Sequence, residues 1–209
     1  DVLRAFSAEA YAFAQGAREI SAVSTVTEAL ERKRLDPELL LMGEEYGYRV
    51  PGFDFGNSPA ELAAQELGGR RLVHRSSAGT QGVVTTTRAR ITLVASLVCA
   101  RVTAEYLRKL QPRQVDYIIT GRMRDHTGED DAACADYIDA MLQGRPMSPQ
   151  TAIDRVLASH PGQMFLNKEP EHPWRADLDY CLQVDRFDFV MLVERLNGDC
   201  VVRKLAPQG

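Results

Sequence analysis

Short apolar runs typical of β-strands alternate with helix-like segments through the first two thirds of this 209-residue chain. The strand-like runs are 18–23, 39–42, 71–74, 90–95 and 115–120. Such alternation predicts an α/β fold, a layered α/β/α arrangement with helices on a mainly parallel or mixed sheet. Two later runs, 189–193 and 200–204, predict antiparallel strands added in the C-terminal third.

Several helix-like segments begin with residues that cap helices. Ser148 and Pro149 have the N-cap and first-position chemistry of a helix that we expect to run to about residue 158. Thr25 and Glu28 form a capping-box pattern at the start of another helix. The remaining predicted helices are 7–15, 99–110, 129–142 and 178–184.

The length predicts a single α/β domain over residues 1–209, with 145–209 as a C-terminal subregion. Asp1-Val2-Leu3 reads as the end of a strand, so we expect residues upstream of it in the natural chain. The formal net charge is -4 and no basic stripe is present, which argues against nucleic acid as a partner. The sequence does not determine the oligomeric state and is compatible with a homo-oligomer.

Targeting signals are missing from the sequence. No apolar run is long enough for a transmembrane helix, and no signal-peptide pattern occurs, so we expect no membrane partner. The four cysteines are widely separated and make no CxxC pair. Isolated cysteines among apolar neighbours are typical of a reduced, cytoplasmic protein.

The chemistry-bearing residues follow the predicted strands, whereas the segments after helices are plain. In an α/β sheet, ligands bind at the carboxyl ends of the strands. We therefore expect these segments to converge on one edge: 1–4, 43–45, 52–59, 76–82 and 122–130.

The most unusual of these segments is 52–59, GFDFGNSP. Ser58, Pro59 and Glu61 are expected to cap a helix that begins there. The N-terminus of a helix attracts anions such as phosphate. Taken by itself, the segment is better explained as a turn with a helix cap, which contributes about 1 kcal/mol. Because it is one of several such segments that follow predicted strands, we expect it to take part in a ligand site as well as to form a turn.

Acidic residues on these segments favour a hard cation such as Mg²⁺ over zinc, because histidines are few and no cysteines are paired. These residues are Asp1, Glu44, Asp54, Asp125, Glu129 and Asp130. Arg4, Arg122 and Arg124 supply positive charge for an anionic substrate, and the loop 76–80 has backbone N–H groups to cradle its oxygens. The combination predicts phosphoryl transfer to water.

Simpler explanations stay open for several of these residues. Asp130, three residues after Thr127, fits a capping box equally well, and Glu129 fits the helix dipole. Asp54 fits loop bracing as well as catalysis. His126 is a candidate acid or base, although a lone loop histidine is more often idle. The other histidines are not part of any predicted site: His74, His160 and His172. The side chains of Tyr46 and Tyr48 are expected to pack against the protein.

Several familiar sites are absent from the sequence. It contains no GxGxxG, no Walker A pattern, no GxSxG and no cysteine-phosphatase loop. The DFG at 54–56 is not accompanied by any other protein-kinase motif in the sequence. No DxD motif of the haloacid-dehalogenase kind follows a predicted strand.

An ordered set of stretches resembles the 2-phosphosulfolactate phosphatase family over almost the entire chain. The stretches are DVLRA at 1–5, GEExG at 43–47, GFDFGNSP at 52–59, SSAGT at 76–80, ASLVCARVTAEYL at 95–107, the GED turn and helix at 128–138, and DLDYCLQVD at 177–185. The resemblance implies a Mg²⁺-dependent enzyme that hydrolyses 2-phospho-3-sulfolactate to sulfolactate and phosphate, a step towards coenzyme M in methanogens.

The resemblance also implies roles for individual residues. The implied catalytic residues are Asp1, Glu44, Asp54 and Glu129. The implied metal ligands are Asp1, Glu129 and Asp130. The implied contacts of the small phosphorylated organic acid are Arg4, Asn57, Ser58, Gly79 and Thr80, and we add Ser77 as part of the loop 76–80 that is expected to hold phosphate. Spacing leaves open whether water attacks directly or through a phospho-aspartyl intermediate.

Some residues depart from the family pattern. Phe6 and Ser7 stand where the family usually has threonine and serine, and 76–78 replaces two threonines and an asparagine. These changes bear on the substrate more than on the phosphatase class. The alternatives are a phosphatase for a different small phosphorylated acid, and a non-catalytic protein that binds an anionic metabolite.

Overall fold

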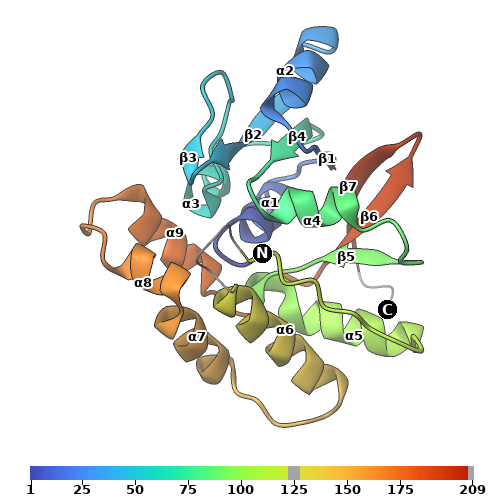
Figure 1. Cartoon of the computed structure of the whole chain (residues 1–209), viewed down its shortest axis with the longest axis vertical. Helices are drawn as coiled ribbons and strands as arrows, with labels where there is room; N and C mark the ends of the chain where they lie inside the picture. Colours follow the sequence, from blue (N-terminus) through green and yellow to red (C-terminus); the bar gives the residue numbers. More distant parts are fainter. Residues whose placement is uncertain (122–127, 207–209) are drawn as a thin grey trace.

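The computed structural model describes residues 1–121 and 128–206. Within that part of the chain one seven-stranded sheet has the order β3-β2-β4-β1-β7-β6-β5 (Figure 1). The strands are β1 (Glu19–Ala22), β2 (Leu40–Glu45), β3 (Tyr48–Arg49), β4 (Arg71–Arg75), β5 (Thr92–Val94), β6 (Val190–Leu196) and β7 (Asp199–Leu205).

The sheet has a parallel half and an antiparallel half. Strand β4 lies between β2 and β1 and is parallel to both, so that Val73 pairs with Leu41 on one side and Ser21 on the other. Strand β7 is antiparallel to β1, and β6 and β5 continue the antiparallel pairing. The predicted α/β class and the antiparallel C-terminal strands are therefore confirmed, with a sheet that is mixed.

Helices occupy the connections. They are α1 (Ala5–Ala14), α2 (Val26–Leu35), α3 (Pro59–Ala63), α4 (Gly79–Thr85), the 3-10 turn η1 (Leu97–Cys99), α5 (Ala100–Leu110), α6 (Glu129–Leu142), α7 (Pro149–Ala158), α8 (His160–Leu166) and α9 (Pro173–Cys181). The predicted N-caps are confirmed, because Thr25, Ser58 and Ser148 each accept a backbone N–H with their side chains. The capping boxes differ from expectation, because Glu28 accepts the N–H of Ser24 and Glu61 that of Gly56. No helix in the described ranges has the length and apolar character needed to cross a membrane.

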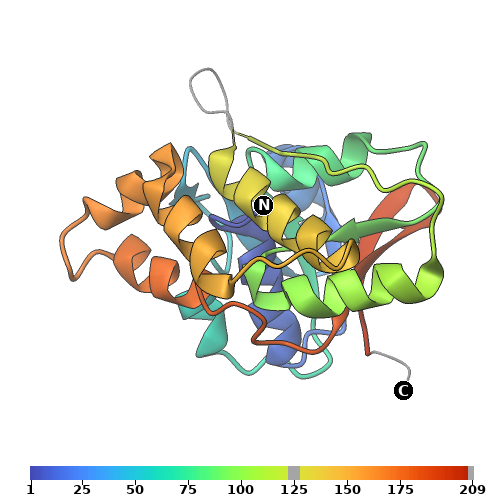
Figure 2. The same cartoon turned by 90° about the horizontal axis from the view of Figure 1, so that it is seen from below.

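Side chains alternate across the parallel strands and bury both faces. Leu41 and Val73 pack in a cluster with Ala29 of α2. Their neighbours Met42 and Leu72 face the opposite side, in the large core cluster that contains most of α1. Helix α1 is buried along nearly its whole length and packs against α3. Helices α5 to α9 extend along one side of the molecule (Figures 1 and 2).

Two predicted strands are wrong. Residues 115–120 form no strand, because the N–H and hydroxyl of Thr120 bond to the Asp131 carboxylate instead of a neighbouring strand. Ile118 and Ile119 are also 60% and 38% exposed, so the apolar run does not mark a covered strand. Residues 2–4 form a turn that leads into α1 rather than the end of a strand.

The chain between 160 and 181 also differs from expectation. Helix α8 was not predicted, although Ser159 caps it by accepting the N–H of Gly162 at 3.0 Å. Gly162 permits close packing on α7, since a Cβ there would lie 2.0 Å from the carbonyl oxygen of Val156. Helix α9 begins earlier than predicted because His172 caps it and Pro173 fits the first position.

Candidate active site

Residues 1–4, called the N-terminal segment below, lie where several helices begin (Figure 2). The Asp1 carboxylate accepts the N–H of Ala5 at 3.0 Å through Oδ1. Its Oδ2 lies against the start of α4, because a Cβ added to Gly79 would be only 2.9 Å from it. Glycine at position 79 is therefore what lets the Asp1 carboxylate approach the loop that follows β4.

Two buried carboxylates at the start of α6 hold the N-terminal segment from another side. Asp130 Oδ2 accepts the N–H of Leu3 at 3.2 Å, and Asp131 Oδ1 accepts the N–H of Val2 at 2.9 Å. Burial, followed by the charge of Asp131, raises the pKa of Asp130 to about 7. The N-cap of α6 is Gly128, so Asp130 does not form the predicted capping box.

Glu44, at the end of β2, joins two strand-end loops. Its carboxylate accepts the backbone N–H of Ser77 and, through Oε2, the Ser77 hydroxyl at 3.1 Å. The same Oε2 accepts the N–H of Gly47 at 2.7 Å. Glu44 is 7% exposed. Both of its oxygens therefore hold loop backbone in place.

The loop between β4 and α4 is braced from within. Thr80 is fully buried, and its hydroxyl accepts the N–H of Ser76 at 2.9 Å. The N–H of Thr80 in turn donates to the Ser76 hydroxyl at 2.9 Å. This reciprocal pair fixes the loop that carries Ser77 and Gly79.

Arg4 is buried in a pocket made by distant parts of the chain. Its Nη1 donates to Asp177 Oδ2 and its Nη2 to the carbonyl oxygen of Gly47, both at 2.7 Å. The guanidinium lies 5.1 Å from the Trp174 ring centre and 5.5 Å from that of Phe165. Protein groups therefore bind both terminal nitrogens of the Arg4 guanidinium, and two aromatic rings lie against it. These contacts favour a role for Arg4 in ordering the site.

Asp177 is the functional neighbour that sequence reasoning missed. Its fully buried carboxylate also accepts the Ser58 hydroxyl and, at 3.3 Å, the N–H of Ala60. The start of α3, predicted to receive a substrate anion, therefore holds an anion of the protein itself. The signal was present in the DLDYC stretch, where the helical pattern made Asp177 look like an ordinary helix residue.

Asn57, next to Ser58, reaches into the core. Its Oδ1 lies 3.0 Å from Nε2 of His74, and Nδ1 of His74 lies 2.7 Å from Oε1 of Glu9. His74 and Glu9 are both fully buried. No sequence pattern connects Glu9, His74 and Asn57, because they come from α1, β4 and the loop before α3.

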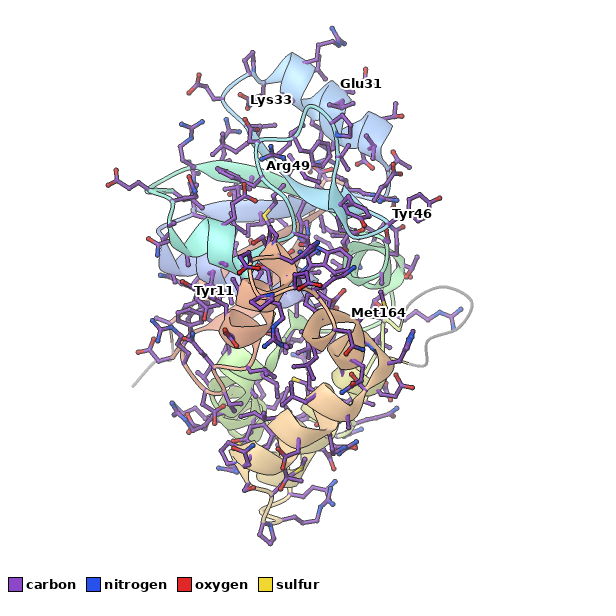
Figure 3. The ribbon with its side chains drawn as sticks, turned by 90° about the vertical axis from the view of Figure 1, so that its left-hand side faces the viewer. Tyr11, Glu31, Lys33, Tyr46, Arg49 and Met164 are labelled. Carbon is purple, nitrogen blue, oxygen red and sulfur yellow. The ribbon has the colours of Figure 1, made fainter. Side chains whose placement is uncertain are left out.

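Asp54 and Glu129 lie apart from this cluster. Asp54 accepts the N–H of Leu41, near the start of β2, at 2.7 Å and lies 3.4 Å from Nζ of Lys33 (labelled in Figure 3). These contacts favour loop bracing over catalysis. Glu129 is exposed and lines a hollow of about 380 Å³ with Arg155 and His160, while its neighbour Asp130 faces the N-terminal segment.

The predicted packing of the tyrosine pair is wrong for Tyr46. That side chain is 67% exposed and projects from the β2–β3 turn (Figure 3). Tyr48 is 63% exposed, and one face of its ring lies 5.7 Å from the Trp174 ring.

Four candidate residues lie outside the described part of the chain: Arg122, Arg124, Asp125 and His126. In residues 1–121 and 128–206, no three or more His, Cys, Asp or Glu side chains gather as a metal site would require. Magnesium, however, usually takes only one or two protein carboxylates together with phosphate oxygens. Asp1, in the N-terminal segment, and Asp130, which binds the N–H of Leu3, are carboxylates of the required kind.

Comparison with known proteins identifies the family of the chain. The family model described as 2-phosphosulpholactate phosphatase matches residues 1–195. This chain belongs to that family. The predicted family and the predicted enzyme class, a phosphoric monoester hydrolase, are thereby confirmed.

Curated relatives agree with the family assignment. A probable 2-phosphosulfolactate phosphatase of Bacillus subtilis (strain 168) is 33% identical over 196 residues, covering 93% of this chain and 85% of the relative. One from Carboxydothermus hydrogenoformans is 34% identical over 202 residues, covering 91% and 82%. One from Clostridium perfringens (strain SM101 / Type A) is 32% identical over 214 residues, covering 95% and 85%.

Proposed function

We propose that this member of the 2-phosphosulfolactate phosphatase family is a Mg²⁺-dependent enzyme that hydrolyses 2-phospho-3-sulfolactate to sulfolactate and phosphate. The observation that carries the proposal is the cluster around the N-terminal segment, where Asp1 meets Gly79 and Asp130 binds Leu3. These groups lie beside the loop that follows β4 at the carboxyl end of the parallel strands, the usual ligand position in an α/β sheet.

Asp1 and Asp130 are the residues that would hold Mg²⁺. Oδ1 of Asp1 accepts the N–H of Ala5 and Oδ2 of Asp130 accepts the N–H of Leu3, and these bonds orient both carboxylates. The burial and the Asp131 charge that raise the pKa of Asp130 also make a cation favourable there. When bound, Mg²⁺ would neutralise phosphate charge and polarise its oxygens.

The chain's own groups then bind and orient the substrate. Backbone N–H groups of the loop 76–80 provide donors for phosphate oxygens. Glu44 holds Ser77 in that loop, and Thr80 braces it from the core. Arg4 and Ser58 fix Asp177. In this proposal Asp1 and Asn57 contact the reacting ligand, whereas Glu44, Arg4, Ser58 and Thr80 shape the site.

Phosphate release by purified protein tests the proposal. The substrates are phosphosulfolactate, phospholactate and phosphoglycolate, each with Mg²⁺ and with EDTA. We expect release from phosphosulfolactate that EDTA abolishes and added Mg²⁺ restores. No release from any of the three would overturn the proposal, and thermal stabilisation without turnover would indicate a metabolite-binding protein. Release that EDTA does not change would contradict the metal dependence.

A further inference from the structure

A chain of polar side chains crosses the core from α1 to the loop before α3. Glu9 Oε1 lies 2.7 Å from Nδ1 of His74, and Nε2 of His74 lies 3.0 Å from Oδ1 of Asn57. Glu9 and His74 are fully buried, and Asn57 is 5% exposed. His74 projects from β4 on the same face as Leu72, against the buried side of α1.

Stability alone does not account for this chain. A carboxylate and an imidazole are costly to bury, and a buried ion pair is often no more stabilising than apolar side chains of similar size. Oε2 of Glu9 makes no hydrogen bond to another group in the described part of the chain.

The donors and acceptors indicate what the chain does to Asn57. An amide oxygen only accepts hydrogen bonds, so Nε2 of His74 is the donor in its contact with Oδ1 of Asn57. This N–H fixes the plane of the amide, while Nδ1 of His74 shares a proton with Oε1 of Glu9. The NH₂ group, at the other end of that amide, then faces away from His74. No hydrogen bond to this NH₂ is found within the described part of the chain.

We propose that Glu9 and His74 are positioning residues, which hold Asn57 so that its NH₂ group donates to the anionic substrate. The N–H at Nε2 keeps Oδ1 of Asn57 on His74 and leaves the NH₂ group at the far end of the amide. Asn57 directly precedes Ser58, which is hydrogen-bonded to Asp177, the partner of Arg4. The inference rests on the proposed function, because it names the substrate as the acceptor.

Substitutions that keep size but change charge or donors test this role. Asn57→Asp keeps the acceptor for His74 and replaces the NH₂ with a carboxylate oxygen. Glu9→Gln keeps the size of the side chain and replaces the carboxylate that shares a proton with Nδ1 of His74 by an amide. We expect kcat/KM with Mg²⁺ and phosphosulfolactate to fall about ten- to a hundredfold in each, with Tm nearly unchanged.

Thr103→Val is the matched control. Thr103 is a buried polar residue that donates to the carbonyl oxygen of Cys99 within α5, away from the site. Valine keeps its shape, so kcat/KM should stay at the wild-type value. A purely structural role of Glu9 would lower Tm and leave kcat/KM of the folded enzyme unchanged, which would overturn the inference.

A second pair of variants keeps the test decisive if Glu9→Gln does not fold. His74→Gln retains an N–H that reaches Oδ1 of Asn57, whereas His74→Leu retains none. We expect kcat/KM of His74→Gln to be at least about tenfold higher than that of His74→Leu. Equal kcat/KM values for two folded variants would refute a positioning role for His74.

Binding of inorganic phosphate separates this inference from the proposed function. The side-chain amide NMR signals of Asn57 can be assigned by their loss in Asn57→Asp. We expect phosphate to shift these signals in the wild type and to shift them less in Glu9→Gln. This response without turnover would refute the phosphatase activity and keep the inference. An unresponsive Asn57 in an active enzyme would refute the inference alone.

Discussion

The parallel and antiparallel halves of the sheet differ in how their polar residues are used. Around β2, β4 and β1, charged and amide groups are buried and hold one another, as Arg4 holds Asp177 and Glu9 holds His74. In the antiparallel half, charges form partly exposed pairs such as Arg203 with Glu194. The comparison indicates that buried pairs of ionisable side chains gather around the site, and that the antiparallel half mainly supplies core.

The largest expected effect compares two arginines, one from each half. Arg4→Met leaves the Asp177 carboxylate buried without its guanidinium, which should lower the unfolding free energy by about 3–5 kcal/mol. Arg203→Met removes two partly exposed pairs, with Glu194 and Glu19, and each should contribute less than about 1 kcal/mol. Urea denaturation of both variants measures the difference, and similar losses would contradict the comparison.

Activity should separate the halves in the same way. Asp1→Asn removes the charge of a proposed metal ligand and should lower kcat/KM about a hundredfold or more, with little change in Tm. Its counterpart Glu194→Gln, on β6, should leave kcat/KM unchanged. Titration with Mg²⁺, followed by Tm, should stabilise the wild type and Glu194→Gln but not Asp1→Asn. A full Mg²⁺ response in Asp1→Asn would remove Asp1 from the metal site.

Two glycines allow a finer comparison. Gly79→Ala places a Cβ 2.9 Å from Asp1 Oδ2, so the carboxylate must move and kcat/KM should fall about ten- to a hundredfold. Gly198, in the turn between β6 and β7, has a φ of +91° and no close neighbours. Gly198→Ala should therefore cost about 1–2 kcal/mol of stability and leave kcat/KM unchanged. Kinetics and urea denaturation of both variants test this comparison. An unchanged kcat/KM in Gly79→Ala, or a reduced one in Gly198→Ala, would contradict it.

The smallest expected difference concerns two helix caps. Ser148→Ala, at the exposed start of α7, should cost about 1 kcal/mol of unfolding free energy. Ser58→Ala removes the same kind of cap and also the hydrogen bond to buried Asp177, so it should cost about 1 kcal/mol more. Equal losses in urea denaturation would show that the Ser58–Asp177 contact contributes nothing.

Local chemistry made much of the fold predictable. The bounds of α6 and the start of α7 follow from residues close in sequence, such as Ser148 with Pro149. The predicted strand 115–120 failed because its polar groups bond to Asp131, a tertiary contact that no local pattern reveals. The strand-end rule placed Glu44, Ser77 and Gly79 near one another. It could not reveal Glu9, because that contact depends on how α1 docks on β4.

The pairing of Arg4 with Asp177 joins residues 173 positions apart and has a consequence for biosynthesis. During translation, the ribosome therefore makes the guanidinium long before its partner. Asp131 and Asp130 likewise follow their partners Val2 and Leu3 by 129 and 127 residues. We therefore expect nascent chains that lack α9 to be inactive, with residues 1–4 accessible to proteases or chaperones until α9 has been synthesised.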